Sequence, residues 1–335
     1  MKVVVIGAGV VGLSSAIRIA ERGHSVCVLA VRRTPNTTSD YSAAAFTPLR
    51  ERSDPEVRRW TADSHAAFLQ LAADSSSRSG VDLAQLCEYF YEPQPSPPWW
   101  HELLVNSERL RTPPAPYVDA FCSTIPRIHM AVYMPYLEAR FARLRGAELR
   151  TERVESILAL FDRGYQIVVN SSGLGASELV PDPAMVPIRG QVLRVPNDLA
   201  LTDCLIAQSR GELATYVFPF PNHVVLGGTY ESGEWRETTE WNALEAIVAR
   251  CRALVAANGH ASADRLGMSR LSTVAGLRPG RMSSTQTHAE NVRLEIERLD
   301  RGRAVIHNYG HGRSGVTLSW GCAAAVADLV DSARR

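Results

Sequence analysis

The stretch KVVVIGAGVVG, Lys2–Gly12, decides the fold of this chain. Its first half, Lys2–Ile6, is a run of mostly β-branched residues, which is typical of a strand buried on both faces in a parallel sheet. A helical stretch follows and ends at Gly23, and a second β-rich run covers Ser25–Val31. We therefore predict a β-turn-α-β unit of about 30 residues, which begins a dinucleotide-binding domain.

The three glycines of this stretch have distinct expected roles. Gly7 permits the tight turn, Gly9 lets the backbone approach a pyrophosphate, and Gly12 allows the helix and the strand to pack closely. The backbone N–H groups at the start of the helix then bind the phosphates. The sequence predicts that the whole turn contacts the cofactor, namely Gly7, Ala8, Gly9, Val10, Val11 and Gly12.

The end of the second strand departs from the usual pattern for such a site. Ala30 stands where an acidic residue would bind a ribose hydroxyl, and Arg32 and Arg33 follow. Arginine at this place could bind the 2′-phosphate of NADP or pack over an adenine and its phosphates. The local motif therefore leaves both FAD and NADP open, with Arg32 and Arg33 as expected cofactor contacts.

Composition excludes several classes of function. The chain has 335 residues, a formal net charge of +1, and 36 basic residues, of which only Lys2 is a lysine. No lysine is left for a Schiff base, no P-loop sequence exists, and the charge balance argues against a nucleic-acid partner. The histidines and six cysteines show no metal-ligand spacing, so we expect neither a metal nor a disulfide framework. Because no stretch suits a membrane span, we expect a cytoplasmic protein without a membrane partner.

The remaining pattern predicts an α/β protein in which a Rossmann-type domain is interrupted by a second domain with an antiparallel sheet. We expect a helix at 54–73, with Asp54 as its N-cap and Pro55 in its first turn. Further helices are expected at 134–145, 241–257 and 316–333, and strands at 165–170, 186–195, 215–220, 223–229 and 304–307. The expected first domain comprises residues 1–53, 133–185 and 281–335, and the expected second domain comprises residues 54–132 and 186–280.

Several motifs along the chain together resemble one known family, the D-amino-acid oxidase family of FAD enzymes. The resemblance covers nearly the full length, and its last three motifs are the specific ones. The motifs are Val3–Gly12 with TPNTTSDYSAAAFTP, VNSSGLGAS (Val169–Ser177), RGQVLRV (Arg189–Val195), YVFPFPNHVVLGGTYESGEW (Tyr216–Trp235), AGLRPGR (Ala275–Arg281) and HNYGHGRSGVTLSWGCA (His307–Ala323). The resemblance implies FAD as the cofactor.

The resemblance also implies roles for individual residues. Arg278 matches the arginine that holds the substrate α-carboxylate, and a planar, permanently charged guanidinium suits that task. Tyr216 matches a tyrosine whose hydroxyl binds the same carboxylate. Further cofactor contacts are implied near the phosphates and the flavin ring, at Thr38, Ser39, Val154, Ser171, Ser172, Gly173, Gly310, Gly312, Gly315, Val316 and Thr317.

Two positions depart from the family pattern. Arg313 stands where the family usually has glycine, which places a cation near the expected substrate and makes it a candidate site residue. Glu212 stands where many members carry a tyrosine. Arg313 would favour an acidic side chain and Glu212 a basic one, or the two would pair. His307 and His311 are interpreted as structural residues rather than as general bases.

The resemblance implies oxidation of D-amino acids to 2-oxo acids, with release of ammonia and hydrogen peroxide. Hydride passes from Cα to flavin N5, and oxygen is the second substrate. Three alternatives stay open: a related FAD amine oxidase for glycine-like, secondary-amine or biosynthetic-precursor substrates, an NADP-dependent dehydrogenase, and a flavoprotein that has lost turnover. The sequence leaves a homodimer open as well.

Overall fold

The computed structural model describes residues 1–48, 54–208, 214–267, 269–282 and 291–333. The chain divides into two compact units, which are described separately. Unit 1 comprises Met1–Val81, Met130–Pro187 and Arg278–Arg335, and unit 2 comprises Asp82–His129 and Ile188–Leu277. Three segments thus form the first unit and two form the second, and their boundaries differ from those of the expected domains.

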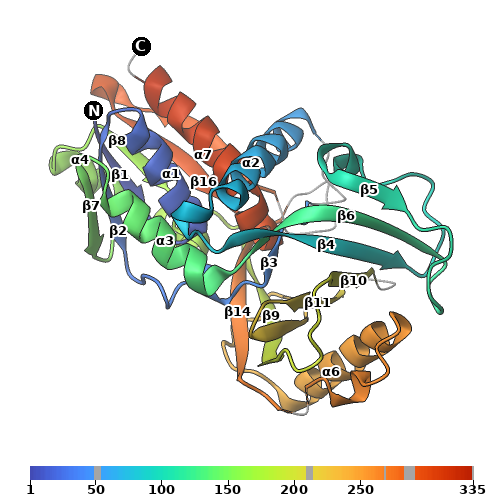
Figure 1. The fold of residues 1–335 in the computed structure, drawn as a ribbon. Helices are drawn as coiled ribbons and strands as arrows, with labels where there is room; N and C mark the ends of the chain where they lie inside the picture. Colours follow the sequence, from blue (N-terminus) through green and yellow to red (C-terminus); the bar gives the residue numbers. More distant parts are fainter. Residues whose placement is uncertain (49–53, 209–213, 268, 283–290, 334–335) are drawn as a thin grey trace. The chain divides into compact units, whose positions relative to one another are not determined.

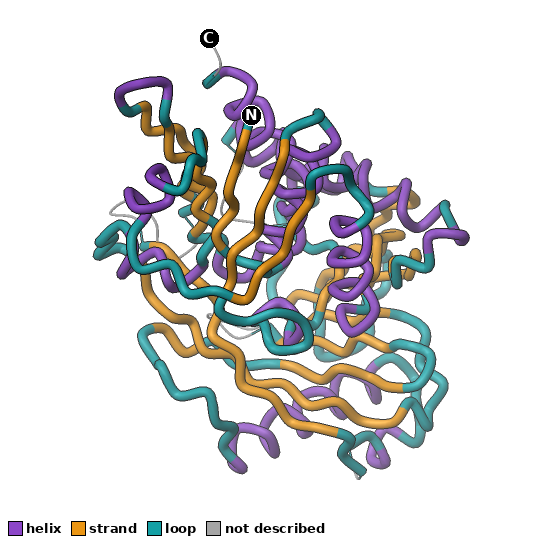
Figure 2. The backbone as a smooth tube through the Cα atoms, turned by 90° about the vertical axis from the view of Figure 1, so that its left-hand side faces the viewer, coloured by secondary structure: helices purple, strands orange, loops and turns teal. Residues whose placement is uncertain are grey.

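A six-stranded sheet forms the centre of unit 1, with the strand order β15-β16-β8-β1-β2-β7. The strands from β16 to β7 run parallel, and β15 is antiparallel to β16. The strands of this sheet lie side by side in Figure 2. The bounds are β1 Lys2–Ile6, β2 Ser25–Ala30, β7 Ala147–Thr151, β8 Ile167–Asn170, β15 Arg293–Arg298 and β16 Ala304–Tyr309. The continuous β-branched run at the N-terminus is therefore a central strand, since β1 lies between β2 and β8.

Helices pack around this sheet (Figure 1). Those that pack against one another are α1 Val10–Glu21, α2 Pro55–Ala73, α3 Met130–Ala142 and α7 Gly315–Ser332. The short helix α4, Ile157–Asp162, packs instead on side chains of β1, β2 and β8, such as Val4, Leu29 and Val168. The same unit holds the two-residue strand β3, Ala44–Ala45, and the one-turn helix α5, Ala176–Leu179.

Helix α2 begins where the sequence predicts, but it belongs to unit 1 and not to the second domain in which it was expected. Asp54 is its N-cap, accepts a hydrogen bond from the N–H of Val57, and is followed by Pro55. The helix packs tightly on α7, because the hydroxyl of Ser64 accepts from the N–H of Gly321 at 2.8 Å. A Cβ atom at Gly321 would lie 2.1 Å from the backbone oxygen of Trp60. The unit boundary therefore falls after Val81 and not near residue 53.

Unit 2 is built on a mainly antiparallel sheet with the strand order β13-β9-β12-β11-β10-β4-β6. In addition, β14 pairs with β9 and β5 pairs with β6. The bounds are β4 Val81–Phe90, β5 Val105–Arg109, β6 Asp119–Ile128, β9 Met185–Pro196, β10 Cys204–Gln208, β11 Thr215–Pro219, β12 His223–Gly227, β13 Glu231–Ser232 and β14 Ser272–Arg281. The β9 and β14 strands carry the chain from one unit into the other.

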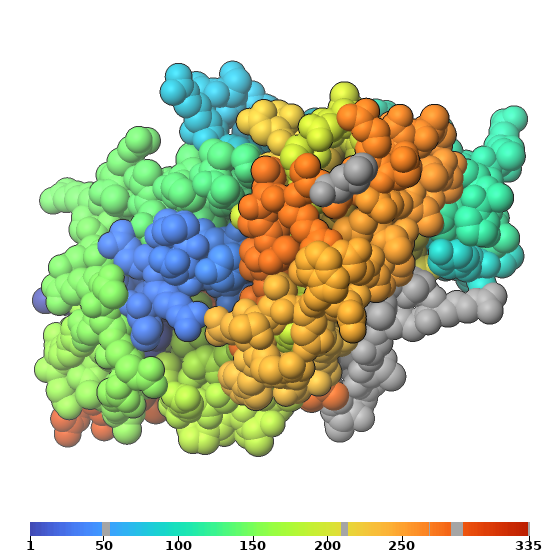
Figure 3. All heavy atoms as spheres, turned by 90° about the horizontal axis from the view of Figure 1, so that it is seen from below, coloured from blue at the N-terminus to red at the C-terminus, as the bar shows by residue number. Residues whose placement is uncertain are grey.

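Helix α6, Trp241–Ala257, covers one face of this second sheet. Its apolar side, with residues such as Ile247, Leu254 and Val255, forms one core cluster with strand residues such as Val217 and Leu226. The opposite side of the helix is exposed, and the segment that contains it, in gold and orange, lies on the surface in Figure 3. Burying this apolar face stabilises the unit by roughly 25 cal/mol per Å².

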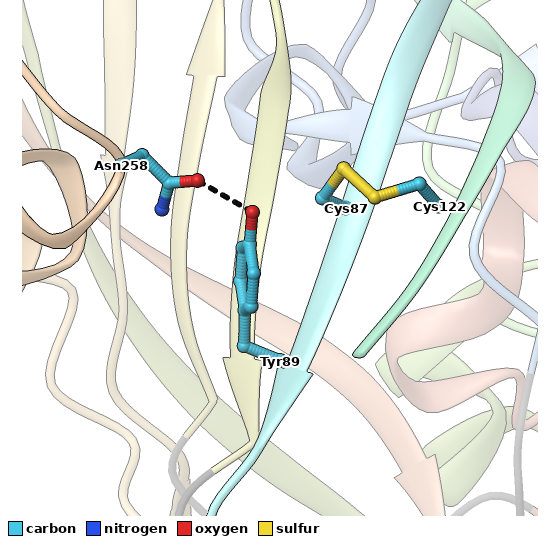
Figure 4. The surroundings of a disulfide bond; sticks show 4 residues. All are labelled: Cys87, Tyr89, Cys122 and Asn258. Carbon is cyan, nitrogen blue, oxygen red and sulfur yellow. Dashed lines mark hydrogen bonds between the residues drawn. A yellow bond between two sulfur atoms is a disulfide. The ribbon is translucent and has the colours of Figure 1, made fainter. Parts of the chain in front are cut away.

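One disulfide joins Cys87 of β4 to Cys122 of β6, with a Cα–Cα distance of 4.2 Å (Figure 4). The sequence predicts no disulfide framework, and it does not anticipate this single bond. The two residues are 35 positions apart in the chain, so their spacing gives no local signal, and only the pairing of the strands brings them together. Nearby, the hydroxyl of Tyr89 donates to the side-chain oxygen of Asn258.

Among the described residues, no helix has both the length and the apolar character that a membrane span requires. The same part of the chain holds no group of three or more His, Cys, Asp and Glu side chains placed to bind a metal ion.

Candidate cofactor and substrate site

The turn after β1 requires glycine at two places. Gly7 has a φ of +110°, which L side chains rarely adopt, and a Cβ atom there would lie 2.3 Å from the carbonyl oxygen of Ser171. A Cβ atom at Gly12 would lie 2.0 Å from the carbonyl oxygen of Gly7. Because Gly7 and Gly12 have no side chains, three segments can approach one another closely: strand β1, helix α1 and the loop after β8. Both glycines do what the sequence predicts of them.

The N-terminus of α1 is held by Ser39. Gly9 is the N-cap, and the N–H of Val10 donates to the hydroxyl oxygen of Ser39 at 3.0 Å. Ser39 belongs to a short 3-10 helix, Thr38–Tyr41, which is fixed by a capping box between Thr37 and Asp40. The positive end of the α1 dipole lies at this place, which favours an anion such as a phosphate. Ser39 thus lies at the turn Gly7–Gly12, and Thr38, next to it, is exposed.

The loop after β8 lies against the same turn. The side-chain oxygen of Asn170 accepts from the hydroxyl of Ser172 at 2.7 Å. The Oγ atom of Ser171 is buried and has no hydrogen-bond partner among the residues that the structure describes, whereas buried hydroxyls are usually bonded. A ligand with phosphate oxygens would supply such a partner. Next in the chain, Gly173 has a φ of +61°, and a Cβ atom there would lie 3.7 Å from Cβ of Pro279.

The glycine-rich segment between β16 and α7 also reaches the turn. Gly310 directly follows β16 and has a φ of +84°, and Gly312 has a φ of +54°. Gly315 is the first residue of α7, and a Cβ atom there would lie 3.9 Å from Cγ2 of Val11. In the first turn of α7, Val316 and Thr317 are buried, and the Thr317 hydroxyl lies 3.5 Å from the carbonyl oxygen of Thr47.

His311, inside this segment, is buried, and burial lowers the pKa of its imidazole to about 4. Its Nε2 atom has no hydrogen-bond partner within the described ranges. His307 is buried too, and its Nε2 atom lies 3.5 Å from a carboxylate oxygen of Glu297. Burial lowers the pKa of His307 as well, so both rings are neutral at pH 7.

The residues that follow β2 have different surroundings. The backbone oxygen of Ala30, where the acidic residue is missing, accepts from the N–H of Glu152. Arg32 is exposed. Arg33 forms an ion pair with Glu138 of α3 at 2.7 Å, and this carboxylate raises the pKa of the guanidinium. The Arg33 guanidinium thus already has an anionic partner in the protein.

Three further predicted site residues belong to unit 1. Arg278 is half-buried in the last part of β14. An isolated backbone bridge between Gly280 and His311 places the end of this strand beside the glycine-rich segment. Arg313 is exposed in the middle of that segment's 3-10 turn, Gly312–Ser314. Val154 is half-buried against the core cluster that contains α4.

Tyr216 lies in unit 2, on β11 opposite Gly227 of β12. Its ring stacks on Phe218, with 5.0 Å between ring centroids, and covers the backbone of Gly227 and Gly228. Arg250 of α6 donates to the carbonyl oxygen of Gly228 at 3.1 Å and to the hydroxyl of Thr215 at 3.2 Å. Glu212 lies outside the described residues.

The residues that support this tyrosine were not predicted, and neither was Asp182, whose carboxylate accepts from Arg281 at the end of β14. The Gly227–Gly228 pair was visible as a signal, since paired glycines in a strand mark a close approach of another group. Arg250 and the buried Asp182 gave no signal, because their partners lie far away in the chain.

These features are those of a dinucleotide-binding fold. The family model described as FAD dependent oxidoreductase matches residues 2–329. The chain is 40% identical to the D-amino-acid oxidase of Rubrobacter xylanophilus, over 99% of this chain and 96% of that protein. It is 31% identical to the D-aspartate oxidase of Homo sapiens, over 98% of this chain and 94% of that protein. The chain therefore belongs to the D-amino-acid oxidase family of FAD-dependent oxidoreductases.

A solved structure agrees in fold. The glycine oxidase of Geobacillus kaustophilus superposes with a TM-score of 0.77 at 19% identity, over 98% of this chain and 94% of that chain. The cofactor is FAD, so the FAD interpretation of the sequence is confirmed and the NADP alternative is wrong. The turn of unit 1 fits this group, because Gly7 and Gly12 leave the backbone bare and Ser171 presents an unpaired buried hydroxyl beside it.

Proposed function

We propose that the protein oxidises D-amino acids to 2-oxo acids. The observation that carries the proposal is the 40% identity, over almost the whole chain, to a protein named D-amino-acid oxidase. When bound, FAD would supply the acceptor for the hydride from Cα and the route by which both electrons reach oxygen. One D-amino acid, one oxygen and one water then give one 2-oxo acid, one ammonium ion and one hydrogen peroxide.

In this proposal Arg278 and Tyr216 bind the substrate carboxylate. A guanidinium can form two parallel hydrogen bonds to a carboxylate, which fixes the plane of the group as well as its position. The phenol of Tyr216 would donate a further hydrogen bond. Its ring is held on β11 by Phe218 and by the bare backbone of Gly227, so its hydroxyl has a defined direction.

The cofactor contacts are proposed along one surface of unit 1. The backbone of Gly7–Gly12, the hydroxyl of Ser39 and the loop Ser171–Gly173 would bind the phosphates, with Thr38 and Val154 beside them. The segment Gly310–Thr317 would face the flavin ring, and the N-terminus of α7 would stabilise negative charge there. Arg32 and Arg33 are proposed nearer the adenine, with Arg33 held by Glu138.

No side chain is needed as a general base in this scheme. The neutral amine of the substrate supplies the electron pair that drives hydride loss, and fixing the carboxylate orients Cα. His311 and His307 are neutral above about pH 6.5, since burial lowers the pKa of each imidazole. They add no positive charge that would compete with Arg278 for the carboxylate.

Turnover in air tests the proposal. The purified protein should consume D-alanine and release pyruvate, ammonia and hydrogen peroxide in equal amounts, and L-alanine should give none of the three. A panel with glycine, sarcosine and D-aspartate separates the related amine-oxidase alternative and reports the influence of Arg313. Higher kcat/KM for glycine or sarcosine than for every D-amino acid would overturn the proposal.

A further inference from the structure

Asp182 is a buried carboxylate in the short loop between α5 and β9, and it is about 7% exposed. One of its oxygens accepts from Nε of Arg281 at 2.8 Å and from the hydroxyl of Tyr309 at 2.9 Å. The other accepts from the N–H of Ala184 at 3.0 Å. A carboxylate with this set of donors is fixed in orientation. Burial alone would raise the pKa of this carboxyl, but the hydrogen bonds from Arg281, Tyr309 and Ala184 outweigh burial and lower the pKa.

The two side-chain donors end the two strands that carry predicted site residues. Arg281 is the last residue of β14, three positions after Arg278. Tyr309 is the last residue of β16, directly before Gly310. Asp182 is therefore a side-chain link between the strand of the proposed carboxylate clamp and the segment proposed to face the flavin.

Backbone contacts show that the linked segments touch. A Cβ atom at Gly310 would lie 2.8 Å from Cβ of Arg281. The N–H of Met282 donates to the carbonyl oxygen of Ala184 at 2.8 Å, which ties the Asp182 loop to the end of β14. Small shifts at Asp182 would therefore pass directly to both strands.

The link extends to a second arginine. Arg293 of β15 donates to the hydroxyl oxygen of Tyr309 at 2.7 Å, so the Tyr309 hydroxyl both accepts and donates. Tyr309 is about 1% exposed, and burial raises the pKa of its phenol to about 12. Removing the carboxylate would leave Arg281 and Tyr309 without their buried partner, which is costly in a site shielded from water.

We propose that Asp182 is a positioning residue of the cofactor site. Its carboxylate holds the end of β14 beside the start of the Gly310–Thr317 segment. It thereby fixes the position of Arg278 relative to the backbone that is proposed to face the flavin. The inference rests on the proposed contact of this segment with FAD and on the proposed role of Arg278. It does not depend on which amine is the substrate.

The experiment compares FAD binding in three variants of the full chain. Apoprotein is titrated with FAD, and the dissociation constant is read from the change in flavin fluorescence at a temperature well below unfolding. Asp182→Asn should raise this constant about tenfold or more, since a hydrogen-bonded charge is lost, and Tyr309→Phe should raise it severalfold. The control is Glu178→Gln, four positions before Asp182, which removes an exposed carboxylate paired with Arg153. The FAD dissociation constant of this variant should stay within about twofold of the wild-type value.

The outcomes separate positioning from mere stability. A lower melting temperature of the Asp182→Asn apoprotein with FAD affinity within twofold of the wild type overturns the inference. If Asp182→Asn does not fold, Tyr309→Phe decides in the same way, because it keeps the ring and loses only the hydroxyl. Where a D-amino acid is turned over, KM for it should rise more than kcat falls. If no D-amino acid reduces the flavin, the proposed function fails while the FAD titration still decides the role of Asp182.

Discussion

The ring of Tyr216 lies so close to Gly227 on the neighbouring strand that no side chain fits between them. A Cβ atom at Gly227 would come within 2.0 Å of Cζ of the ring, and one at Gly228 within 2.7 Å of the hydroxyl oxygen. The two residues face each other directly in the antiparallel pairing of β11 and β12. The Tyr216 ring, and with it the hydroxyl, can therefore take this direction only because Gly227 has no side chain.

Gly227→Ala should displace the Tyr216 ring. We expect KM for a D-amino acid to rise about tenfold and the flavin content to stay unchanged. Overpacking should lower the free energy of unfolding by about 1–3 kcal/mol. In a Tyr216→Ala background, the same glycine change should cost less stability, because the clash is gone. Equal costs in both backgrounds, measured by urea unfolding, would show that the ring and the glycine do not constrain each other.

Arg278→Ala should weaken substrate binding while leaving the flavin in place. We expect KM to rise about 100-fold or more, since a charge-assisted pair of hydrogen bonds is lost, and Arg278→Lys to keep part of the affinity. Arg236→Ala, which removes an exposed arginine paired with Glu234, is the matched control and should change nothing. Steady-state kinetics and the flavin absorbance of the purified variants check both expectations. A KM within twofold of the wild type for Arg278→Ala would remove this residue from the site.

Acid should destabilise the protein through its buried histidines. The pKa of His311 is lowered to about 4 in the folded protein, against about 6.5 in the unfolded chain, so the unfolded state binds more protons between these values. The free energy of unfolding should therefore fall as pH decreases from about 6.5 to 4, by up to about 3 kcal/mol for this residue. The sign is the same for His223, whose pKa is also lowered to about 4. Urea unfolding of the apoprotein at pH 7, 6 and 5 should show a smaller slope for His311→Gln, whereas an unchanged slope would contradict this reason.

The Cys87–Cys122 bond should contribute measurably to stability. Closing a loop with a sequence separation of 35 residues stabilises a protein by about 3–4 kcal/mol in the chain-entropy treatment. Dithiothreitol should lower the urea midpoint of the wild type but not that of a Cys87→Ser/Cys122→Ser double variant. Denatured, unreduced protein should titrate with four thiols out of six cysteines. Six thiols would mean that the bond does not form in the isolated protein.

Local patterns were enough to predict the elements that carry the glycine-rich turn Gly7–Gly12. The run Lys2–Ile6, the glycines after it and the Asp54–Pro55 start of α2 each act through neighbours in the chain, so the sequence shows them directly. The unit to which α2 belongs was not predictable in this way. It depends on Trp60 and Ser64 meeting Gly321, which lies more than 250 positions further along.

The supporting residues of the site were hidden for the same reason. Asp182 is one carboxylate among many in the sequence, and only the ends of β14 and β16 bring Arg281 and Tyr309 to it. From the sequence, Arg33 is a cation near the glycine-rich turn with no visible partner. In the structure, α3 places Glu138 next to it. Charge partners that come from distant segments cannot be assigned from spacing alone.

The most direct test of the central claim is flavin reduction in the absence of oxygen. The purified holoprotein is mixed anaerobically with D-alanine, D-aspartate and their L enantiomers, and the absorbance of the oxidised flavin is followed. The proposed function predicts that at least one D-amino acid bleaches the flavin completely, that its L enantiomer does not, and that air restores the colour with formation of hydrogen peroxide. A flavin that keeps its colour with every D-amino acid, or that bleaches equally with both enantiomers, would contradict it.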